Sequence, residues 1–224
     1  MTRLLVLAIL VAASVSVPSE CSSHPATSSS QEAAHFHVVV RAYSNELMPV
    51  EEWYAALAMA SRILADAAVD VEWLQCGRAE PASSPCNAPV ATDELALRMI
   101  DVHTPRQFLG KLPVGYSLVD TGLHRGTLAT IYYDRVLWLA AAGHADPLTL
   151  AARAIAHEIG HLLRGGNEHS TSGLMRAVWD RDELRRDNQQ DWQFTAADAR
   201  AMRAGFMARP RTTTVEGAVA WGTR

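Results

Sequence analysis

The chain of 224 residues contains a single lysine, Lys111, and its other 19 basic residues are arginines. These residues form no basic cluster, and the formal net charge is −4. Proteins that bind nucleic acid usually carry a basic patch or stripe, so the sequence indicates no nucleic-acid partner. With 49% hydrophobic and 20% charged residues, the composition also excludes a wholly disordered chain, a coiled coil and a collagen-like fibre. The sequence has no internal repeat, and its length suits one mid-sized domain.

No convincing membrane span is visible, because the apolar run at residues 4–17 has only 14 residues. A transmembrane helix needs about 20. A basic Arg3 precedes the run and a polar stretch follows it, so we interpret residues 1–20 as a signal peptide and residues 21–34 as a flexible linker. We therefore expect a secreted or periplasmic protein that is not inserted in a membrane once the signal is cleaved. An uncleaved membrane anchor is the alternative.

Cysteine is scarce, with three residues in the chain. Cys76 and Cys86 bracket a loop rich in proline, serine and alanine. In an oxidising compartment we expect them to form a disulfide, which adds about 2–3 kcal/mol of stability for so short a loop. Cys21 remains in the linker, where a thiol that caps a metal is an alternative role for it.

From residue 35 onward, strand-like and helix-like segments alternate. Segments rich in β-branched and aromatic residues are predicted strands: 35–43, 70–75, 94–101, 115–120 and 126–136. Helices are predicted at 49–68, at 137–142 and from Pro147 onward, where Asp146 is the expected N-cap. This order predicts one α/β (α+β) domain over residues 35–207, followed by a poorly ordered tail at 208–224.

The helix that starts near Pro147 contains the sequence His157-Glu158-Ile159-Gly160-His161. Histidines four residues apart project from one face of a helix and can place two imidazole nitrogens about 2.0–2.1 Å from one zinc ion. Glu158 lies beside that face, where it can accept a proton from a zinc-bound water. The aliphatic residues of the helix point the opposite way, so we expect this helix to form the wall of a cleft.

A catalytic zinc needs a third protein ligand and one open position. Gly165 and Gly166 end the helix and allow the chain to reverse, which makes His169 the candidate third ligand. Met175 follows in a tight turn, where its side chain would lie beneath the metal.

The run at residues 157–175, HEIGHLLRGGNEHSTSGLM, resembles the zinc site of the metzincin metallopeptidases, and of the matrixins in particular. The resemblance implies Zn²⁺ bound by His157, His161 and His169, with Glu158 as general base and Met175 as the residue of the Met-turn. It further implies a mixed twisted sheet with a backing helix, an active-site helix, a Met-turn and a C-terminal helix. The domain would be a monomeric endopeptidase that holds a peptide or protein substrate along the edge strand.

This sequence departs from the metzincin spacing at the third ligand. The family pattern has a glycine seven and a histidine ten residues after the first ligand, where this chain has Arg164 and Asn167, and His169 lies twelve residues on. No tyrosine follows Met175, so the tyrosine ligand of some metzincins is missing. One alternative is a gluzincin-type peptidase with Glu183 as third ligand. Others are a catalytically inactive, zinc-stabilised binding module and an exported interaction protein without metal.

Overall fold

The computed structural model describes residues 34–43, 46–77, 81 and 83–210. The expected signal peptide, nearly all of the expected linker, Cys21 and residues 211–224 lie outside this part of the chain. Within the described ranges, no helix combines the length and the apolar character that crossing a membrane requires.

Five strands form one mixed sheet in the order β2-β1-β3-β5-β4. The strands are β1 (Phe36–Tyr43), β2 (Val69–Cys76), β3 (Glu94–Ile100), β4 (Gly115–Asp120) and β5 (Arg125–Tyr132). Neighbouring strands are parallel except for β4, which pairs antiparallel with β5 and forms one edge. The predicted mixed α/β fold class is confirmed.

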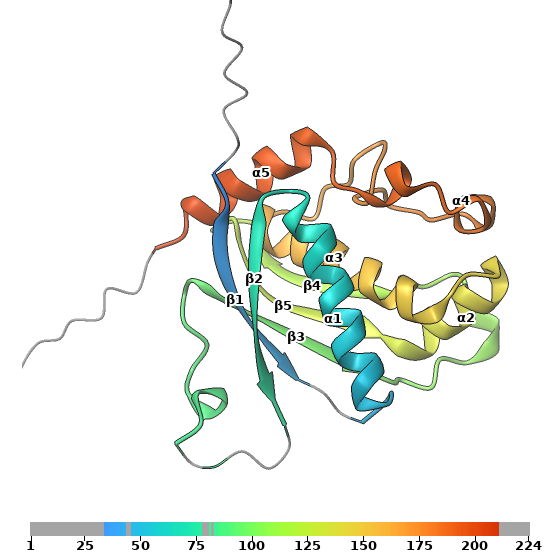
Figure 1. Ribbon diagram of the computed structural model, residues 1–224, viewed down its shortest axis with the longest axis horizontal. Helices are drawn as coiled ribbons and strands as arrows, with labels where there is room; N and C mark the ends of the chain where they lie inside the picture. Colours follow the sequence, from blue (N-terminus) through green and yellow to red (C-terminus); the bar gives the residue numbers. More distant parts are fainter. Residues whose placement is uncertain (1–33, 44–45, 78–80, 82, 211–224) are drawn as a thin grey trace, which may run out of the picture. The chain divides into compact units, whose positions relative to one another are not determined.

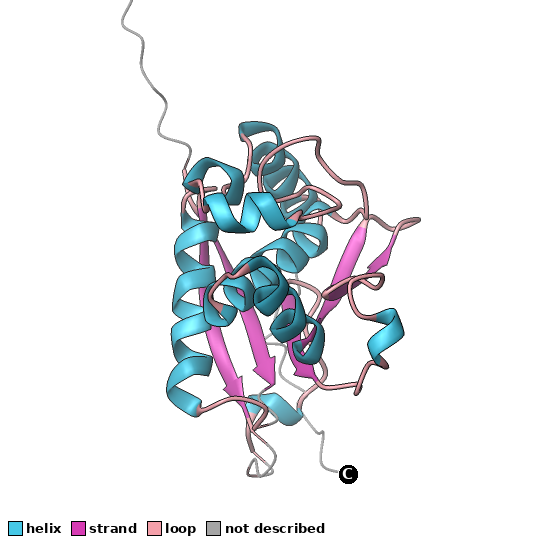
Figure 2. Ribbon diagram, turned by 90° about the vertical axis from the view of Figure 1, so that its right-hand side faces the viewer, coloured by secondary structure: helices cyan, strands magenta, loops and turns pink. Residues whose placement is uncertain are grey.

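Two long helices, α1 (Val50–Ala65) and α3 (Pro147–Arg164), pack against the same face of this sheet (Figure 1, Figure 2). At the β2 end, Trp73 donates a hydrogen bond of 2.7 Å to the hydroxyl of Ser61 on α1. At the β4 end, the Ser117 hydroxyl lies 2.8 Å from the backbone carbonyl oxygen of Glu158 on α3. The alternation of strand side chains therefore turns Trp73 and Ser117 toward the helices.

The helix α2 (Tyr133–Gly143) begins earlier than the sequence suggests. A strand was expected to continue to residue 136, but β5 ends at Tyr132. Val136 and Ala140 are buried four residues apart, which is helical spacing, and Asp134 occupies the first turn of the helix. The aromatic and β-branched residues at 130–136 have high strand propensity, but packing against the core determines the helix.

The helix α3 begins and ends at the expected signals. The Asp146 side chain accepts a hydrogen bond of 2.7 Å from the backbone N–H of Thr149, and Gly165 ends the helix with φ of 68°. The sequence predicts that only the apolar face of this helix is buried. In the structure all residues from Leu150 to Leu163 are buried. The helix is enclosed by the sheet and α1, by α5 (Ala196–Met207) and by the loop that follows Gly165.

The segment after β2 is fixed on the opposite face of the sheet. Cys76 and Cys86 are joined by a disulfide, as the sequence predicts. Arg41, only 3% exposed, donates hydrogen bonds of 2.6 and 3.2 Å to the carbonyl oxygens of Ala88 and Pro89. This loop is therefore held by a covalent bond and by a buried guanidinium.

The first residues of the expected tail are packed against the domain. The sequence predicts a poorly ordered segment from residue 208, but Arg209 is 6% exposed and donates hydrogen bonds to the carbonyl oxygens of Gly126 and Leu162. The packed part of the chain therefore extends to Arg209.

Candidate metal centre

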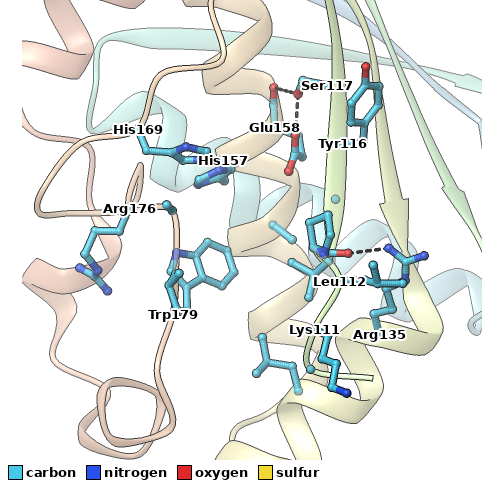
Figure 3. A pocket seen from close by; sticks show the side chains of 18 of the residues that line it. Lys111, Leu112, Tyr116, Ser117, Arg135, His157, Glu158, His169, Arg176 and Trp179 are labelled. Carbon is cyan, nitrogen blue, oxygen red and sulfur yellow. Dashed lines mark hydrogen bonds between the residues drawn. The ribbon is translucent and has the colours of Figure 1, made fainter. Parts of the chain in front are cut away.

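Three histidines converge at the middle of α3. His157 and His161 lie one turn apart on the helix, with their Nε2 atoms 3.1 Å apart. His169 comes from the loop beyond the helix, and one ring nitrogen of each histidine lies within 4.8 Å of those of the other two. Among the described residues this is the group of side chains that can hold a metal ion. Figure 3 shows His169 beside His157 at the upper end of the cleft.

The two helical histidines are each oriented by a backbone carbonyl. Nδ1 of His157 lies 2.9 Å from the oxygen of Leu174, and Nδ1 of His161 lies 3.0 Å from the oxygen of Gly166. A carbonyl oxygen only accepts hydrogen bonds, so both Nδ1 atoms carry the proton. In a neutral imidazole the lone pair is then on Nε2, which is the atom that faces the other histidine.

Burial keeps these imidazoles neutral. It lowers the pKa of His157 to about 3 and that of His161 to about 4, with neighbouring positive charge from Arg164 acting in the same direction. The pKa of His169 is lowered by burial and by Arg164 as well. Two Nε2 lone pairs therefore face each other at 3.1 Å with no proton between them.

This donor set fits a zinc ion. Zinc binds neutral imidazole, and tetrahedral coordination with bonds of 2.0–2.1 Å separates two ligand nitrogens by about 3.3 Å. The facing lone pairs of His157 and His161 match that spacing and repel each other unless a cation lies between them. The residues present therefore suit a metal, and zinc in particular.

The loop that carries His169 is tied to α5. The hydroxyl of Ser170 donates to a carboxylate oxygen of Asp198, which is 2% exposed and also lies 3.3 Å from a guanidinium nitrogen of Arg164. The backbone N–H of Ser170 donates to the carbonyl oxygen of Met175. The sequence gives no sign that Asp198 contacts this loop, although Thr195 and Asp198 form a recognisable capping box at the start of α5.

Met175 is fully buried against α3. A Cβ atom added at Gly160 would lie 2.8 Å from the sulfur of Met175 and 2.8 Å from a ring carbon of Phe194. Gly160 lies between the two helical histidines, so the absence of its side chain allows Met175 to reach the helix at that level. The turn itself is closed at Gly173, where φ is 72°.

Glu158 is turned toward the edge strand. It is 6% exposed, and its Oε2 atom lies 2.6 Å from the hydroxyl of Ser117 on β4. Burial raises the pKa of its carboxyl to about 7, and the hydrogen bond from Ser117 partly opposes this. A Cβ atom added at Gly115 would lie 2.5 Å from Oε1 of Glu158. Gly115 and Ser117, two residues apart on one face of β4, therefore shape the space around this carboxyl. No pattern in the sequence predicts either role.

The other candidate third ligands are Asn167, at the family spacing, and Glu183. Asn167 is exposed at the wall of the cleft. Glu183 accepts a hydrogen bond from the backbone N–H of Asp180 in a capping box at the start of α4 (Arg181–Arg186), and its carboxylate lies 3.3 Å from Arg176. Glu183 is thus engaged in local structure.

A cleft of about 790 Å³ opens in front of the histidines. The segment before β4 and the strand itself form one wall, and residues 176–181 form another. Trp179 packs edge-on against His157, with ring centroids 5.5 Å apart, and its indole N–H donates to the carbonyl oxygen of Leu174. That carbonyl also orients His157, so Trp179 belongs to the site although no pattern in the sequence pointed to it.

No protein-family model matches the chain, and no curated protein sequence does so either. Solved structures with a similar fold include an archaemetzincin from Methanopyrus kandleri, with a TM-score of 0.43 and 16% identity over 78% of this chain and 97% of that chain. Metalloproteinase-II from Bacteroides fragilis has a TM-score of 0.47 and 15% identity over 77% of this chain and 54% of that chain. At such identities the likeness concerns the fold and not the function.

Proposed function

We propose that the protein is a zinc metallopeptidase in which His157, His161 and His169 bind the metal and Glu158 is the general base. The observation that carries the proposal is the pair of buried, neutral imidazoles whose Nε2 atoms face each other at 3.1 Å. The third histidine is within reach of both, and a buried carboxyl from the same helix lines the same cleft.

The residues around the histidines suit hydrolysis of a peptide bond. A zinc ion supplies a Lewis acid and lowers the pKa of a water that it binds. Glu158, with a carboxyl pKa near neutrality, is suited to take a proton and to return it to the leaving amine. The carbonyl oxygens of Leu174 and Gly166 hold His157 and His161 in the tautomer that a metal requires.

The edge strand supports an extended peptide as substrate. In the described part of the chain β4 pairs with β5 on one side only, so its outer edge offers unpaired backbone groups beside Glu158. An extended peptide can add to such an edge as a further strand. Binding along an edge does not require a free chain end, which favours an endopeptidase.

Export of the protein is part of the proposal. A disulfide joins Cys76 and Cys86, and disulfides persist in secreted and periplasmic proteins but are rare in reducing compartments. The basic and apolar start of the sequence points the same way.

Metal content and peptide hydrolysis, measured on the same preparation, test the proposed function. We expect one zinc per chain and cleavage within a mixed peptide library. Glu158→Gln should retain zinc and lose turnover by about 10²–10⁴-fold, because it removes the base and not a ligand. Glu51→Gln, a change of an exposed carboxylate in the first turn of α1, is the control and should retain activity. Absence of zinc would refute the proposal. Zinc without cleavage of any library member would indicate a zinc-stabilised binding module.

A further inference from the structure

The end of the cleft away from the histidines carries three basic side chains from three separate segments. Lys111 belongs to the loop before β4, Arg135 to the first turn of α2, and Arg181 is the first residue of α4. In Figure 3 Lys111 and Arg135 lie below Glu158 and Ser117, with Leu112 beside them. The only lysine of the chain therefore lies in this cleft.

None of these three cations has an acidic partner within 4.0 Å among the described residues. Arg135 donates to the hydroxyl of Thr104 and to the carbonyl oxygen of Pro113, which are neutral groups. Arg181 lies over the ring of Trp138, 6.0 Å from its centroid. Their positive charge is therefore not neutralised by a contacting carboxylate.

Few carboxylates of the cleft oppose this charge. Glu158 lies at the other end, beside the histidines, and is held by Ser117. Asp180 precedes Arg181, and its side chain accepts a hydrogen bond from the backbone N–H of Glu183 at the start of α4. Among the residues that line this end of the cleft, three are cations and one is a carboxylate, in a chain whose net charge is −4. Asp134 and Asp182, the chain neighbours of Arg135 and Arg181, do not line it.

The surface between the histidines and these cations is largely apolar. Its lining side chains are those of Leu112, Val114, Trp138, Leu139, Ala154 and Val178. An apolar side chain of a bound peptide can be buried there. A carboxylate that follows it along the peptide would reach the basic side chains.

We propose that this cleft selects peptides in which an Asp or Glu side chain accompanies a bulky apolar residue, with the carboxylate bound by Lys111, Arg135 and Arg181. This inference rests on the proposed function, since it names the substrate class of the same site. Each exposed ion pair contributes little by itself, so the preference comes from the three cations together. We expect a preference for Glu over Gln of about threefold to tenfold in kcat/KM.

Matched peptides test this preference. The substrates are peptides blocked at both ends that differ only in Glu or Gln at one position, scanned on both sides of the scissile bond. The zinc-loaded protein should prefer Glu at one or two of these positions, and added salt should reduce the preference. In a Lys111→Gln, Arg181→Gln double variant the ratio should fall to about one, because two of the three cations are removed.

The double variant Arg185→Gln, Arg186→Gln provides the matched control. Both residues lie on the same short helix as Arg181, and the variant also loses two positive charges, but neither residue lines the cleft. This variant should retain the full Glu-to-Gln ratio. Equal loss in the control would assign the effect to net charge and would overturn the inference.

Binding of the same peptides, measured by calorimetry, separates this inference from the proposed function. If no peptide is cleaved, but Glu peptides bind more tightly and the double variant abolishes the difference, the peptidase proposal fails and the carboxylate site stands. If peptides are cleaved with equal kcat/KM for Glu and Gln, the carboxylate site is refuted and the peptidase stands. Peptides with a free C-terminal carboxylate are measured beside the blocked ones, and a preference for them, without one for Glu, would also refute the assignment to acidic side chains.

Discussion

The hydroxyl of Ser117 lies 2.6 Å from a carboxylate oxygen of Glu158 and 2.8 Å from the backbone carbonyl oxygen of the same residue. The hydroxyl can share its proton between these two oxygens, or it can donate the proton to the carbonyl oxygen while it accepts a hydrogen bond from a protonated carboxyl. Burial raises the pKa of Glu158 to about 7, which makes that state accessible near neutral pH. The edge strand thus contacts the proposed base directly.

Ser117→Ala should reduce kcat/KM by about 10- to 100-fold while zinc content stays unchanged, because the change removes the group that orients Glu158 and touches no metal ligand. Thr127→Ala on the neighbouring strand β5 is the matched control, since it removes a hydroxyl that does not line the cleft. Steady-state kinetics and metal analysis of the two variants check this prediction. Full activity in Ser117→Ala would mean that Glu158 does not depend on the edge strand.

Gly115→Ala should impair activity through a steric effect on the same carboxyl. The new Cβ atom would lie 2.5 Å from Oε1 of Glu158, so the side chain or the strand must shift. Overpacking of this kind costs about 1–3 kcal/mol of stability. In the control Gly122→Ala, the new Cβ atom would meet its nearest neighbour at 3.4 Å, on an exposed turn. Thermal unfolding and kcat/KM distinguish the two, and equal behaviour of both variants would contradict the prediction.

The sequence predicts the part of the site that lies on one element. The spacing of His157 and His161 follows from helix periodicity, and Asp146 and Gly165 mark where that helix begins and ends. The sequence predicts that Gly115 and Ser117 are alternate residues of one strand. It does not predict that this strand lies against α3. Their role depends on the sheet order, in which β4 is an edge and pairs with β5.

Contacts between distant segments explain why the other features of the site and of the fold could not be predicted from the sequence. Trp179 reaches His157 because the chain returns across α3 after Met175, and Asp198 reaches Ser170 from a helix that begins 26 residues later. No periodic pattern in the sequence predicts such contacts. The early start of α2 has a similar origin, since burial of Val136 and Ala140 outweighs the strand propensity of the residues before them.

Ser170→Ala should weaken zinc binding by about tenfold to 100-fold without removing a ligand, because it releases the His169 loop from the buried carboxylate of Asp198. Ser172→Ala, in the same turn but exposed, is the control and should bind zinc as the parent does. Competition with a chelator of known affinity measures both. Unchanged affinity in Ser170→Ala would show that the loop is positioned by other contacts.

Asp146→Ala should lower the stability of the fold in a pH-dependent way. At pH 7 the loss of this N-cap of α3 costs about 1 kcal/mol. Hydrogen bonds from Thr149 hold the pKa of Asp146 below its ordinary value, so the carboxylate stabilises the folded state above the unfolded pKa of about 3.9. The contribution is lost as the pH falls through the folded pKa, and the parent and variant should converge there. Urea unfolding at several pH values checks this, and a difference that persists at low pH would contradict it.

The final prediction concerns the third metal ligand, where this sequence departs from the metzincin spacing. Its candidates are Asn167 at the family position, His169 two residues later, and Glu183 on α4. His169 has a ring nitrogen within 4.8 Å of those of both helical histidines, and its ring centroid lies 4.8 Å from that of His161. Imidazole is also a far better zinc donor than a carboxamide.

Glu183 has two local partners that compete with any metal, the backbone N–H of Asp180 and the guanidinium of Arg176. We therefore expect His169→Ala to weaken zinc binding by more than the roughly 100-fold of an outer-sphere change, and Asn167→Ala and Glu183→Ala to stay within about tenfold of the parent. Zinc titration of the three variants measures this, with circular dichroism to verify folding. If Glu183→Ala lost the metal and His169→Ala kept it, the ligand set would be that of a gluzincin-type enzyme, because only a rearranged α4 could bring that carboxylate to the two helical histidines.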